Sequence, residues 1–536
     1  MTPLSLTRRA VLAGAAAPLL GCEPPPAPLE GGFAGVSVER GHMLRERRSW
    51  PAPAVTRRTG VLIAGGGVAG LAAARALRLR GVDDFALLEL EDSAGGNSRG
   101  AELGGLPCPM GAHYLPVPGD DAREVQDLLE ELGLRRRVAG RWQYDERHLC
   151  HSPQERLFFN GHWQEGLLPL QGVGAPTLAQ YRRFSQKVAS LQREARFSMP
   201  ALRSPFGPAH AALDALSMAQ WLAQQGLDDP QLLWYLDYCC RDDYGAGLAT
   251  VSAWAGVHYF ASRHGFQAPG DGDAEREAVL TWPEGNAWLT RRLAVPLGDR
   301  LQTGRSVVRI AEAHHGVEVD AWDHRTQTLE RWQARHCVVA LPAFVAARVV
   351  QNPPAVLQAL AARLRYAPWL VANLHLRAPL HDRPGAAPSW DNVLYGSASL
   401  GYVDATHQRL DPRPGPTVLT WYRALGDGPD ARRQLLERPW TAWRDDMLAE
   451  LAVPHPDLDS LATRMTVTRY GHAMAIPTPG LMSQIRRESN TGGHQALSKQ
   501  EQITPATARL RFAHADWSGY SVFEEAFTRG HLAGGF

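Results

Sequence analysis

Glycine residues recur at fixed spacing in the segment Gly65-Gly66-Gly67-Val68-Ala69-Gly70, between an apolar run and an alanine-rich stretch. The spacing G-x-G-x-x-G suits a strand-to-helix turn. The first glycine permits the turn, the second lets backbone approach a pyrophosphate, and the third lets the helix pack on the strand. N–H groups at the start of such a helix can bind an anion. The pattern therefore predicts a dinucleotide site, formed by Gly65, Gly67, Val68, Ala69 and Gly70.

Glu89 follows the glycine motif at the end of a second apolar run. A carboxylate about twenty residues after this motif can accept hydrogen bonds from ribose hydroxyls, and it repels a 2′-phosphate. FAD and NAD share the ribose and the pyrophosphate, so both remain candidates at this point. The alternative is a glycine-rich turn that binds no ligand.

The elements around these residues follow from hydrophobic periodicity, which predicts a strand at Val61–Ala64, a helix at Val68–Leu79 and a strand at Phe85–Leu90. Further strands are expected at 307–310, 317–319 and 337–341, and those of a second sheet at 370–376, 393–395 and 418–422. Residues 122–263 are mostly helical in pattern, with helices expected at 125–134, 178–196, 218–225 and 231–240. Residues 268–277 form a polar break and 481–502 a long surface loop.

This order of elements predicts an α/β fold with two domains. A Rossmann-like, glutathione-reductase-like domain binds the dinucleotide, and a second, α+β domain with a helical insertion binds the substrate. The expected boundaries are 59–121, 276–345 and 471–536 for the first domain, and 122–275 and 346–470 for the second. Residues 23–58 are rich in proline and glycine, so we expect an extended tether before a folded body that begins near Thr59.

Composition excludes several other classes of function. The chain has 536 residues and a formal net charge of +1, so nothing in its charge favours nucleic acid as a partner. Six cysteines include Cys22, and the odd remainder argues against a complete disulfide framework. The adjacent Cys239-Cys240 pair lacks the two-residue spacer of a zinc or redox site, and we predict no metal site.

A second glycine pair, Gly95-Gly96, follows Glu89 and precedes Asn97 and Arg99. This segment resembles the Glu plus Gly-Gly-Arg extension of the flavin amine oxidase and phytoene desaturase superfamily. In that superfamily the glycines and the arginine wrap the pyrophosphate. Asn97 stands at the family's arginine position, so the resemblance assigns the role to Arg99, and the alternative is an exposed arginine on a flexible loop. The cofactor implied is FAD.

Two internal segments carry the same resemblance. Met110–Leu115 resembles the stretch that passes the flavin ring, which implies contacts from Gly111, Ala112 and His113. The stretch from 282 through Pro342 resembles the return of the chain to the FAD domain, where the backbone of Val307 would contact the adenine side.

The C-terminal segment completes the resemblance. Leu510–Trp517 resembles a strand whose carboxylate, here Asp516, binds the ribityl chain. Residues 523–530 resemble the final helix, whose N-terminus at Phe523 and Glu524 points at flavin O2 and stabilises negative charge on the reduced ring.

Few catalytic residues are expected, because hydride transfer to flavin N5 depends mainly on alignment. Lysine occurs only at Lys187 and Lys499, so the lysine that many amine oxidases keep near N5 is expected to be absent. Ala473 stands at a tyrosine position of the family's aromatic cage, and Tyr520 is the candidate for one wall. His113 and His472 are candidates beside the ring, either for proton transfer or as structural histidines.

The sequence features that would contact a substrate are less specific than those that would bind the cofactor. The 16 tryptophans would suit a pocket for an apolar or cationic substrate, but core packing is the alternative. Asp237, Asp242 and Asp243 would attract a polyamine, and a solvated face is the alternative. No cysteine stands in the flavin-adjacent or C-terminal segments, which implies noncovalent FAD.

The first 22 residues have the pattern of an export signal. Arg8-Arg9 precede a short apolar run and resemble a Tat signal, and Leu19-Leu20-Gly21-Cys22 resembles a lipoprotein cleavage box. We expect a periplasmic protein that folds around its cofactor before export and is anchored to the membrane through a lipid on Cys22. The alternative is an uncleaved tail with chance arginines.

The combined hypothesis is an exported FAD-dependent oxidoreductase that passes hydride from a small organic substrate, such as an amine, to flavin N5 and then to oxygen or another acceptor. One alternative is a desaturase or dehydrogenase acting on C–C or C–O bonds, which the absent lysine favours. Another is a flavin-bearing lipoprotein with a binding role and no turnover.

Overall fold

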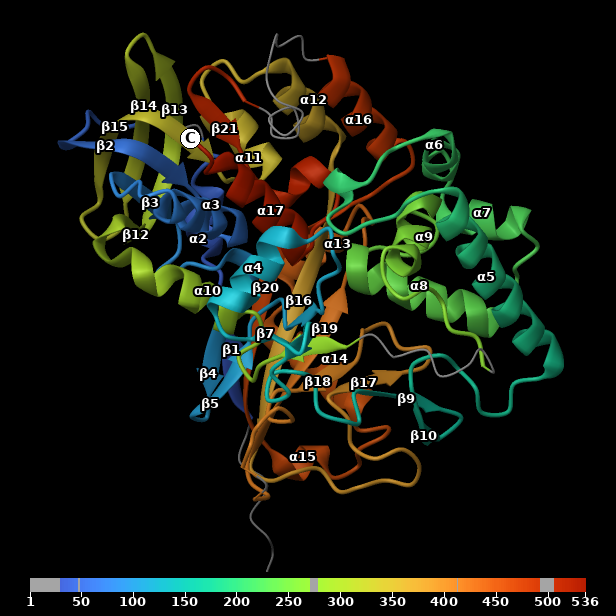
Figure 1. The fold of residues 1–536 in the computed structure, drawn as a ribbon. Coiled ribbons are helices and arrows are strands. Elements are labelled where there is room, and N and C mark those ends of the chain that lie inside the picture. Colours follow the sequence, from blue (N-terminus) through green and yellow to red (C-terminus); the bar gives the residue numbers. More distant parts are fainter. Residues whose placement is uncertain (1–28, 47–48, 270–277, 412, 492–505) are drawn as a thin grey trace, which may run out of the picture.

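The computed structural model describes residues 29–46, 49–269, 278–411, 413–491 and 506–536, and its fold is built on two sheets (Figure 1). One sheet has seven strands and the other has eight. Residues 1–28, which hold the predicted signal, lie outside the described part of the chain, as do most of 268–277 and residues 492–502 of the predicted loop. The predicted α/β class is confirmed.

The seven-stranded sheet has a parallel core in which β2 (Val55–Ala64) lies between β3 (Phe85–Glu89) and β15 (Thr328–Val339). Its other strands are β12 (Leu301–Thr303), β13 (Arg305–Ala313), β14 (Gly316–Asp323) and β21 (Leu510–Phe512). Alternate residues of β2 face opposite sides. Val61 and Ile63 pack with α3 (Val68–Leu79), whereas Leu62 and Ala64 pack with α11 (Ala343–Val349) and α12 (Ala355–Arg363).

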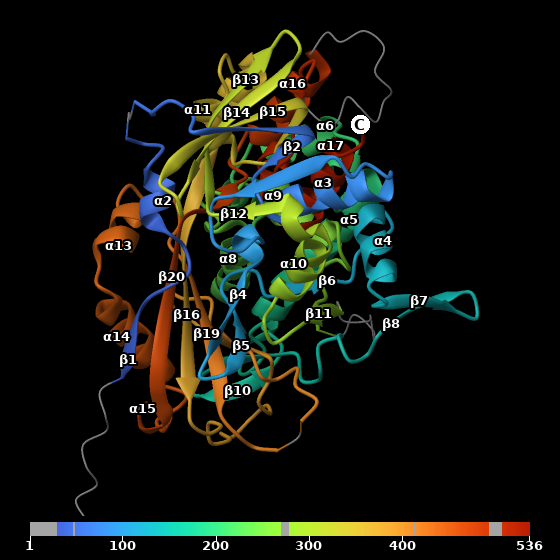
Figure 2. The ribbon, with the colours of Figure 1, turned by 90° about the vertical axis from the view of Figure 1, so that its left-hand side faces the viewer.

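The eight-stranded sheet is mostly antiparallel, and its long central strands are β16 (Arg365–Leu376), β19 (Thr417–Ala424) and β20 (Ala462–Ile476), seen side by side in Figure 2. Its remaining strands are β1 (Glu30–Phe33), β9 (Glu155–Phe159), β10 (His162–Glu165), β17 (Asp391–Leu394) and β18 (Tyr402–Asp404). Leu370 and Ala372 pack with α14 (Trp440–Leu451), whereas Trp369 and Val371 face the opposite side.

The predicted helical region is present and packs on that opposite side (Figure 1). Its helices are α5 (Ala175–Glu194), α6 (Pro208–Asp214), α7 (Met218–Gln224), α8 (Pro230–Tyr244) and α9 (Ala253–Ala261). The prediction of mostly helix from residue 122 is too broad, because the described chain also forms β7 (Arg135–Val138), β8 (Arg141–Tyr144), β9 and β10 after α4 (Arg123–Glu131). These strands are four or five residues long, which is too short for a clear period-2 pattern.

The predicted tether at 23–58 is corrected where it is described. β1 pairs in parallel with β20, α2 (Val38–His42) follows, and β2 begins at Val55 rather than near Thr59. Main-chain pairing with a distant strand leaves no periodicity in the local sequence, so the proline and glycine content dominated the prediction. The predicted loop at 481–502 is also corrected, because α16 occupies Leu481–Thr491.

The remaining α-helices and β-strands of the described chain complete the fold. They are β4 (Gly100–Leu103), β5 (Leu106–Pro109), β6 (Tyr114–Pro116), β11 (Val279–Thr281), α10 (Ala287–Ala294), α13 (Ala431–Glu437), α15 (Leu458–Leu461) and α17 (Phe523–Ala533). The helices of the described residues include none with the length and apolar character that a membrane span needs.

Candidate functional site

A cavity of about 760 Å³ lies where the two sheets meet, and residues of both sheets line it. Its wall includes the glycine turn before α3, the end of β3, the segment before β6, strands β16, β19 and β20, and the start of α17. This volume lies within the range of natural ligand sites. The cavity brings together most of the residues that the sequence nominated.

The glycine turn is built as its spacing predicts. Gly65 has φ +103°, and a Cβ there would stand 2.3 Å from the carbonyl oxygen of Ala340. Gly67 caps α3 without a side-chain hydrogen bond, so the first N–H groups of the helix remain available to an anion. Gly65, Gly67, Val68 and Ala69 line the cavity, while Gly70 instead lets α3 approach the turn, since a Cβ there would lie 1.9 Å from the Gly65 oxygen.

Glu89 lies buried at the wall beside this turn. Its carboxylate accepts hydrogen bonds from the N–H groups of Gly66 and Glu91, each at 2.8 Å. Burial raises the pKa of Glu89, and the two N–H donors and Arg99 oppose that rise. Carboxylate oxygens have further lone pairs, so Glu89 can accept from ribose hydroxyls as well.

The Gly95-Gly96 pair also lines the cavity, but Arg99 does not. The Arg99 guanidinium donates to the carbonyl of Gly96 at 3.3 Å and lies 3.8 Å from the Glu91 carboxylate. The prediction that Arg99 contacts the pyrophosphate is therefore not supported, because its guanidinium contacts Gly96 and Glu91 and does not line the cavity. Asn97 faces the cavity instead, and its Nδ2 donates to the carbonyl of Ala473 at 2.7 Å.

The segment Gly111-Ala112-His113 lines the cavity as the resemblance implies. A Cβ on Gly111 would lie 2.2 Å from the Asn97 carbonyl oxygen, so only glycine fits. The His113 ring stacks on Tyr422 with centroids 4.4 Å apart. Burial lowers the pKa of His113 to about 3, so the ring is neutral near pH 7. His113 can exchange hydrogen bonds there, but it carries no charge.

Asp516 also lines the cavity, and its side chain is buried. It accepts hydrogen bonds from the N–H of Ala343 at 2.8 Å and from the Tyr366 hydroxyl at 2.6 Å. Burial alone would raise the pKa of Asp516, but His514 and these donors hold it below its ordinary value. Val307 lines the same cavity, and the adenine contact that the resemblance implies for it stays a prediction.

The start of α17 faces the cavity through Phe523 and Glu524. The N-cap residue, Val522, makes no side-chain hydrogen bond, so this helix end can also stabilise a negative charge. Glu524 is only 3% exposed, and burial raises its pKa to about 7.

The two remaining catalytic candidates differ in position. His472 lines the cavity and stacks on Phe344 at 4.3 Å, and burial together with Arg432 and Arg45 lowers its pKa to about 4. Tyr520 does not line the cavity. It is fully buried and donates to the Glu525 carboxylate at 2.6 Å, so the prediction that Tyr520 forms a cage wall is not supported.

Aromatic walls come from residues that the sequence analysis did not single out: Tyr114, Trp369, Tyr422 and Tyr470. Trp369 is 9% exposed, and its indole N–H has no hydrogen-bond partner among the described residues. The alternation along β16 was the available signal, because it places Trp369 and Val371 on one face.

Carboxylates of α8 reach the same cavity. Asp242 lines it and accepts from the Tyr114 hydroxyl at 3.5 Å, while Asp243 pairs with Arg263 at 3.0 Å. Burial raises the pKa of Asp242 to about 7. Asp237 lies outside the lining and pairs with Arg241 at 2.9 Å. The solvated-face alternative therefore holds for Asp237 and fails for Asp242 and Asp243.

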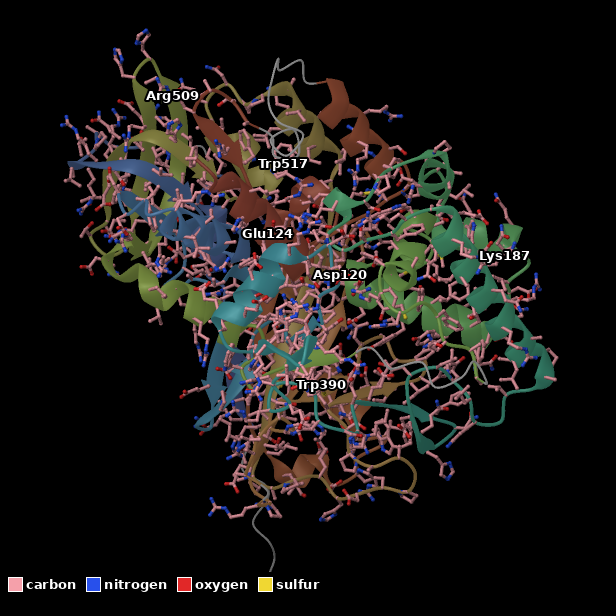
Figure 3. All side chains as sticks on the ribbon, in the orientation of Figure 1. Asp120, Glu124, Lys187, Trp390, Arg509 and Trp517 are labelled. Carbon is pink, nitrogen blue, oxygen red and sulfur yellow. The ribbon has the colours of Figure 1, made fainter. Side chains whose placement is uncertain are left out.

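Among the described residues, this site has neither a lysine nor a cluster of side chains that could hold a metal ion. Lys187 is exposed on α5, at the outer edge of the helical region in Figure 3, and Lys499 lies outside the described residues. The described residues hold no group of three or more His, Cys, Asp or Glu side chains arranged for a metal ion.

Comparison with known proteins adds a family. Residues 68–437 match the family model for flavin containing amine oxidoreductases. The L-amino acid dehydrogenase of Synechocystis is 25% identical over 228 residues, which are 41% of this chain and 43% of that protein. The coproporphyrinogen III oxidase of Mycobacterium tuberculosis is 28% identical over 308 residues, which are 54% of this chain and 60% of that protein. The chain thus spans less than two thirds of these curated relatives.

A solved structure supports the fold. Putrescine oxidase bound to putrescine superposes with a TM-score of 0.65 at 17% identity, covering 89% of this chain and 98% of that one. The superposition agrees with a Rossmann-like FAD domain joined to a substrate domain. The family match covers more than half of the sequence. It includes the cavity-lining residues Gly95-Gly96, Gly111–His113 and Val307, whereas Asp516 and the start of α17 lie after its last residue. The chain therefore belongs to the flavin-containing amine oxidoreductase family.

Proposed function

We propose that this protein oxidises a cationic amine with noncovalently bound FAD. FAD would accept a hydride from the carbon next to the amine nitrogen, and oxygen or another acceptor would then reoxidise it. The observation that carries the amine assignment is a pair of carboxylates that line an aromatic-walled cavity, the partly buried Asp242 and the buried Glu524. Arg263 forms its ion pair with Asp243 rather than with either of them. Burial raises the pKa of both carboxylates and outweighs the opposing charge of Arg263.

The residues present fit FAD. The free N–H groups at the start of α3 suit its pyrophosphate, Glu89 suits its ribose, and Asp516 suits the ribityl chain. The closeness of Gly67 and Gly96 keeps side chains out of this cradle, since a Cβ on Gly96 would lie 3.2 Å from the Gly67 Cα. No cysteine lines the cavity, which supports noncovalent binding.

The carboxylates would act on the substrate in two ways. An ionised carboxylate attracts an ammonium group, and aromatic faces favour the same cation. A carboxylate with a pKa near 7, such as Asp242, can also take the proton that an alkylammonium must lose before its C–H bond is oxidised. Neutral His113 and Tyr422 would position the substrate against the ring.

The second candidate is oxidation of a C–C or C–O bond. The absence of lysine from the described cavity wall favours it, as does the similarity to coproporphyrinogen III oxidase. The two carboxylates that line the cavity favour the amine instead, since an uncharged substrate would offer them no cation.

The export signal completes the proposal. We infer Tat-type export to the periplasm and lipidation at Cys22 from Arg8-Arg9 and Leu19-Leu20-Gly21-Cys22. Replacement of Cys22 by alanine should release the protein from the membrane fraction and leave it exported, whereas replacement of Arg8 and Arg9 by lysine should retain it in the cytoplasm.

Anaerobic titration of the purified holoprotein tests the activity. Putrescine or cyclohexylamine should bleach the yellow flavin band, and alkenes or alcohols should not. Bleaching by alkenes or alcohols alone would replace the proposal with the second candidate.

A further inference from the structure

The segment Glu30–Arg45, which we call the strap, precedes the residues that match the family model and closes one side of the cavity. It supplies seven lining residues: Val36, Ser37, Val38, Gly41, His42, Leu44 and Arg45. We propose that the strap is part of the cofactor site, that it covers the adenosine half of FAD, and that it sets how fast FAD leaves. This inference rests on the FAD of the proposed function but not on the substrate.

One end of the strap is fixed to the second sheet. Strand β1 pairs with β20 from Glu30 to Phe33, and the N–H of Ala34 donates to the carbonyl of Val467 at 3.0 Å. The guanidinium of Arg469 lies 3.6 Å from the centroid of the Phe33 ring. Main-chain pairing and this cation–π contact hold the end against β20.

A tight turn then directs the chain over the cavity. Gly35 has φ +93°, and a Cβ there would lie 2.2 Å from Cε of Met110. Ser37 caps α2, because its Oγ accepts from the N–H of Arg40 at 3.2 Å. The turn and cap bring α2 to the wall that contains Glu89.

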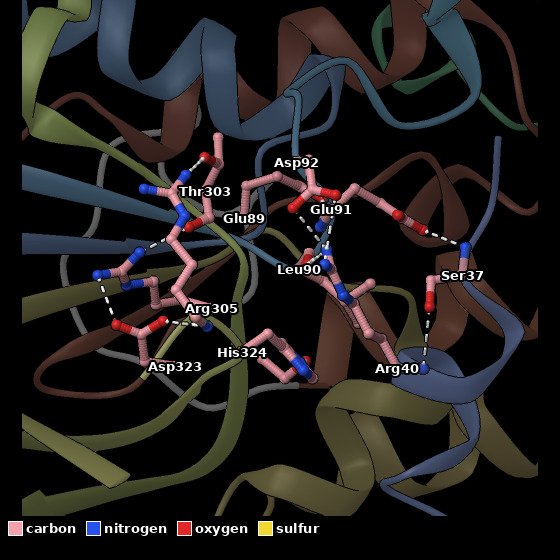
Figure 4. A network of polar contacts seen from close by, with 12 residues as sticks. Ser37, Arg40, Glu89, Leu90, Glu91, Asp92, Thr303, Arg305, Asp323 and His324 are labelled. Carbon is pink, nitrogen blue, oxygen red and sulfur yellow. Dashed lines mark hydrogen bonds and ion pairs between the residues drawn. The ribbon is translucent and has the colours of Figure 1, made fainter. Parts of the chain in front are cut away.

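Hydrogen bonds join α2 and its N-cap residue to the three residues that follow Glu89, as Figure 4 shows. The N–H of Ser37 donates to the Glu91 carboxylate at 3.0 Å. Arg40 donates to the Leu90 carbonyl at 3.1 Å and to both Asp92 oxygens, at 2.9 and 3.3 Å. We call these contacts the latch.

The position of the latch identifies the part of the cofactor that the strap would cover. A carboxylate at the end of the second strand of a Rossmann unit binds the adenosine ribose, and the latch begins one residue after that carboxylate. Beyond α2, Arg348 donates to the carbonyl of Leu44 at 3.1 Å. The strap therefore spans the ribose wall and is held on both sides, and FAD could leave past it only after the latch opens.

The latch is weak enough to open. The Asp92 side chain is 75% exposed and the Arg40 side chain 21%, so water and salt screen their ion pair. The bond from Arg40 to the Leu90 carbonyl is less exposed and charge-assisted. The strap is thus fixed at β1 and releasable at α2.

The test compares FAD release from Arg40→Ala with release from Arg147→Ala. Arg147 also forms an exposed ion pair, with Asp145, but it lies outside the cavity lining. Each holoprotein is passed through an ultrafilter at timed intervals, and FAD is quantified in the filtrate by absorbance. Arg40→Ala should release FAD about five- to thirtyfold faster than the parent, and Arg147→Ala within twofold of it.

The thermal stability of each apoprotein separates a local from a global effect. The proposal requires that the two variants unfold within about a degree of each other without FAD, because the latch acts on cofactor release. Unchanged release in Arg40→Ala would overturn it, as would faster release from an Arg40→Ala variant whose apoprotein unfolds several degrees below that of Arg147→Ala.

A charge-swapped variant gives a second readout. Arg40→Asp combined with Asp92→Arg should release FAD more slowly than either single replacement. Equal release from all three would exclude the ion pair as part of the latch. A parent protein that neither contains nor takes up FAD would instead overturn the cofactor assignment of the proposed function, and the strap proposal with it.

Discussion

Asp242→Asn should weaken binding of a cationic ligand and remove most of its pH dependence. The replacement keeps the shape of the side chain and deletes its charge. Asp242 lines the cavity and accepts one long hydrogen bond, from Tyr114, so the asparagine side chain of the variant should disturb few contacts of the fold. Loss of a charge-assisted contact of this kind costs about 1.5–3 kcal/mol, which is roughly a 10- to 150-fold increase in the dissociation constant.

The pH dependence follows from the pKa of about 7 that burial gives Asp242. The ionised fraction is about 0.09 at pH 6 and about 0.91 at pH 8, so cation affinity should rise about tenfold across this interval. Glu524, with a pKa also raised to about 7, adds to the same rise. Asp243 faces the site too, but Arg263 pairs with it. Any slope that remains in Asp242→Asn should therefore disappear in the double variant with Glu524→Gln.

The assay uses butyltrimethylammonium, whose charge does not titrate. Its dissociation constant is measured from the shift of the flavin absorption band at pH 6, 7 and 8. Asp237→Asn is the matched control, because Asp237 lies on the same helix, pairs with Arg241 and does not line the cavity. The reasoning is refuted if Asp242→Asn and Asp237→Asn bind the ligand equally well at pH 8, or if the parent shows no rise with pH.

Three further predictions concern the cofactor site and its surroundings. Gly70→Ala should purify with little FAD, because its Cβ would overlap the Gly65 carbonyl, whereas Gly428→Ala, with no atom within 4 Å of the new Cβ, should keep its FAD, as measured by absorbance. Tyr520→Phe should lower the free energy of unfolding by about 1–2 kcal/mol in denaturant titration, since the Glu525 carboxylate loses a donor, and the flavin spectrum should stay unchanged. Treatment with EDTA should leave FAD content and amine oxidation as they were, and a loss of either would reveal a metal site beyond the described residues.

The parts of the fold that follow local rules were predictable from sequence. The glycine turn, Glu89 and the helix at Val68–Leu79 depend on contacts within about thirty residues, and their spacing fixes their geometry. The apolar runs in β2 and β16 likewise predicted strands in both sheets, and both faces of each strand are packed.

Other features depend on residues far apart in the sequence and leave no local pattern. β1 is held by pairing with β20, more than 430 positions later in the chain. Arg99 was assigned to the pyrophosphate by its place after Gly95-Gly96, but its side chain contacts Gly96. Tyr520 was the candidate for a wall of the aromatic cage, but its hydroxyl donates to Glu525. The carboxylate beside the aromatic wall is there because α8 brings Asp242 to Tyr114 on β6, which spacing along the chain does not show.

Anaerobic reduction by an amine tests the central claim most directly. The holoprotein is mixed with putrescine in the absence of oxygen, and the flavin absorption band is followed over time in parent and Asp242→Asn samples. We predict complete bleaching of the parent, and slower bleaching of the variant that approaches the parent rate only at higher amine concentration. A parent whose flavin stays oxidised with putrescine, cyclohexylamine and every other amine tested would contradict the account.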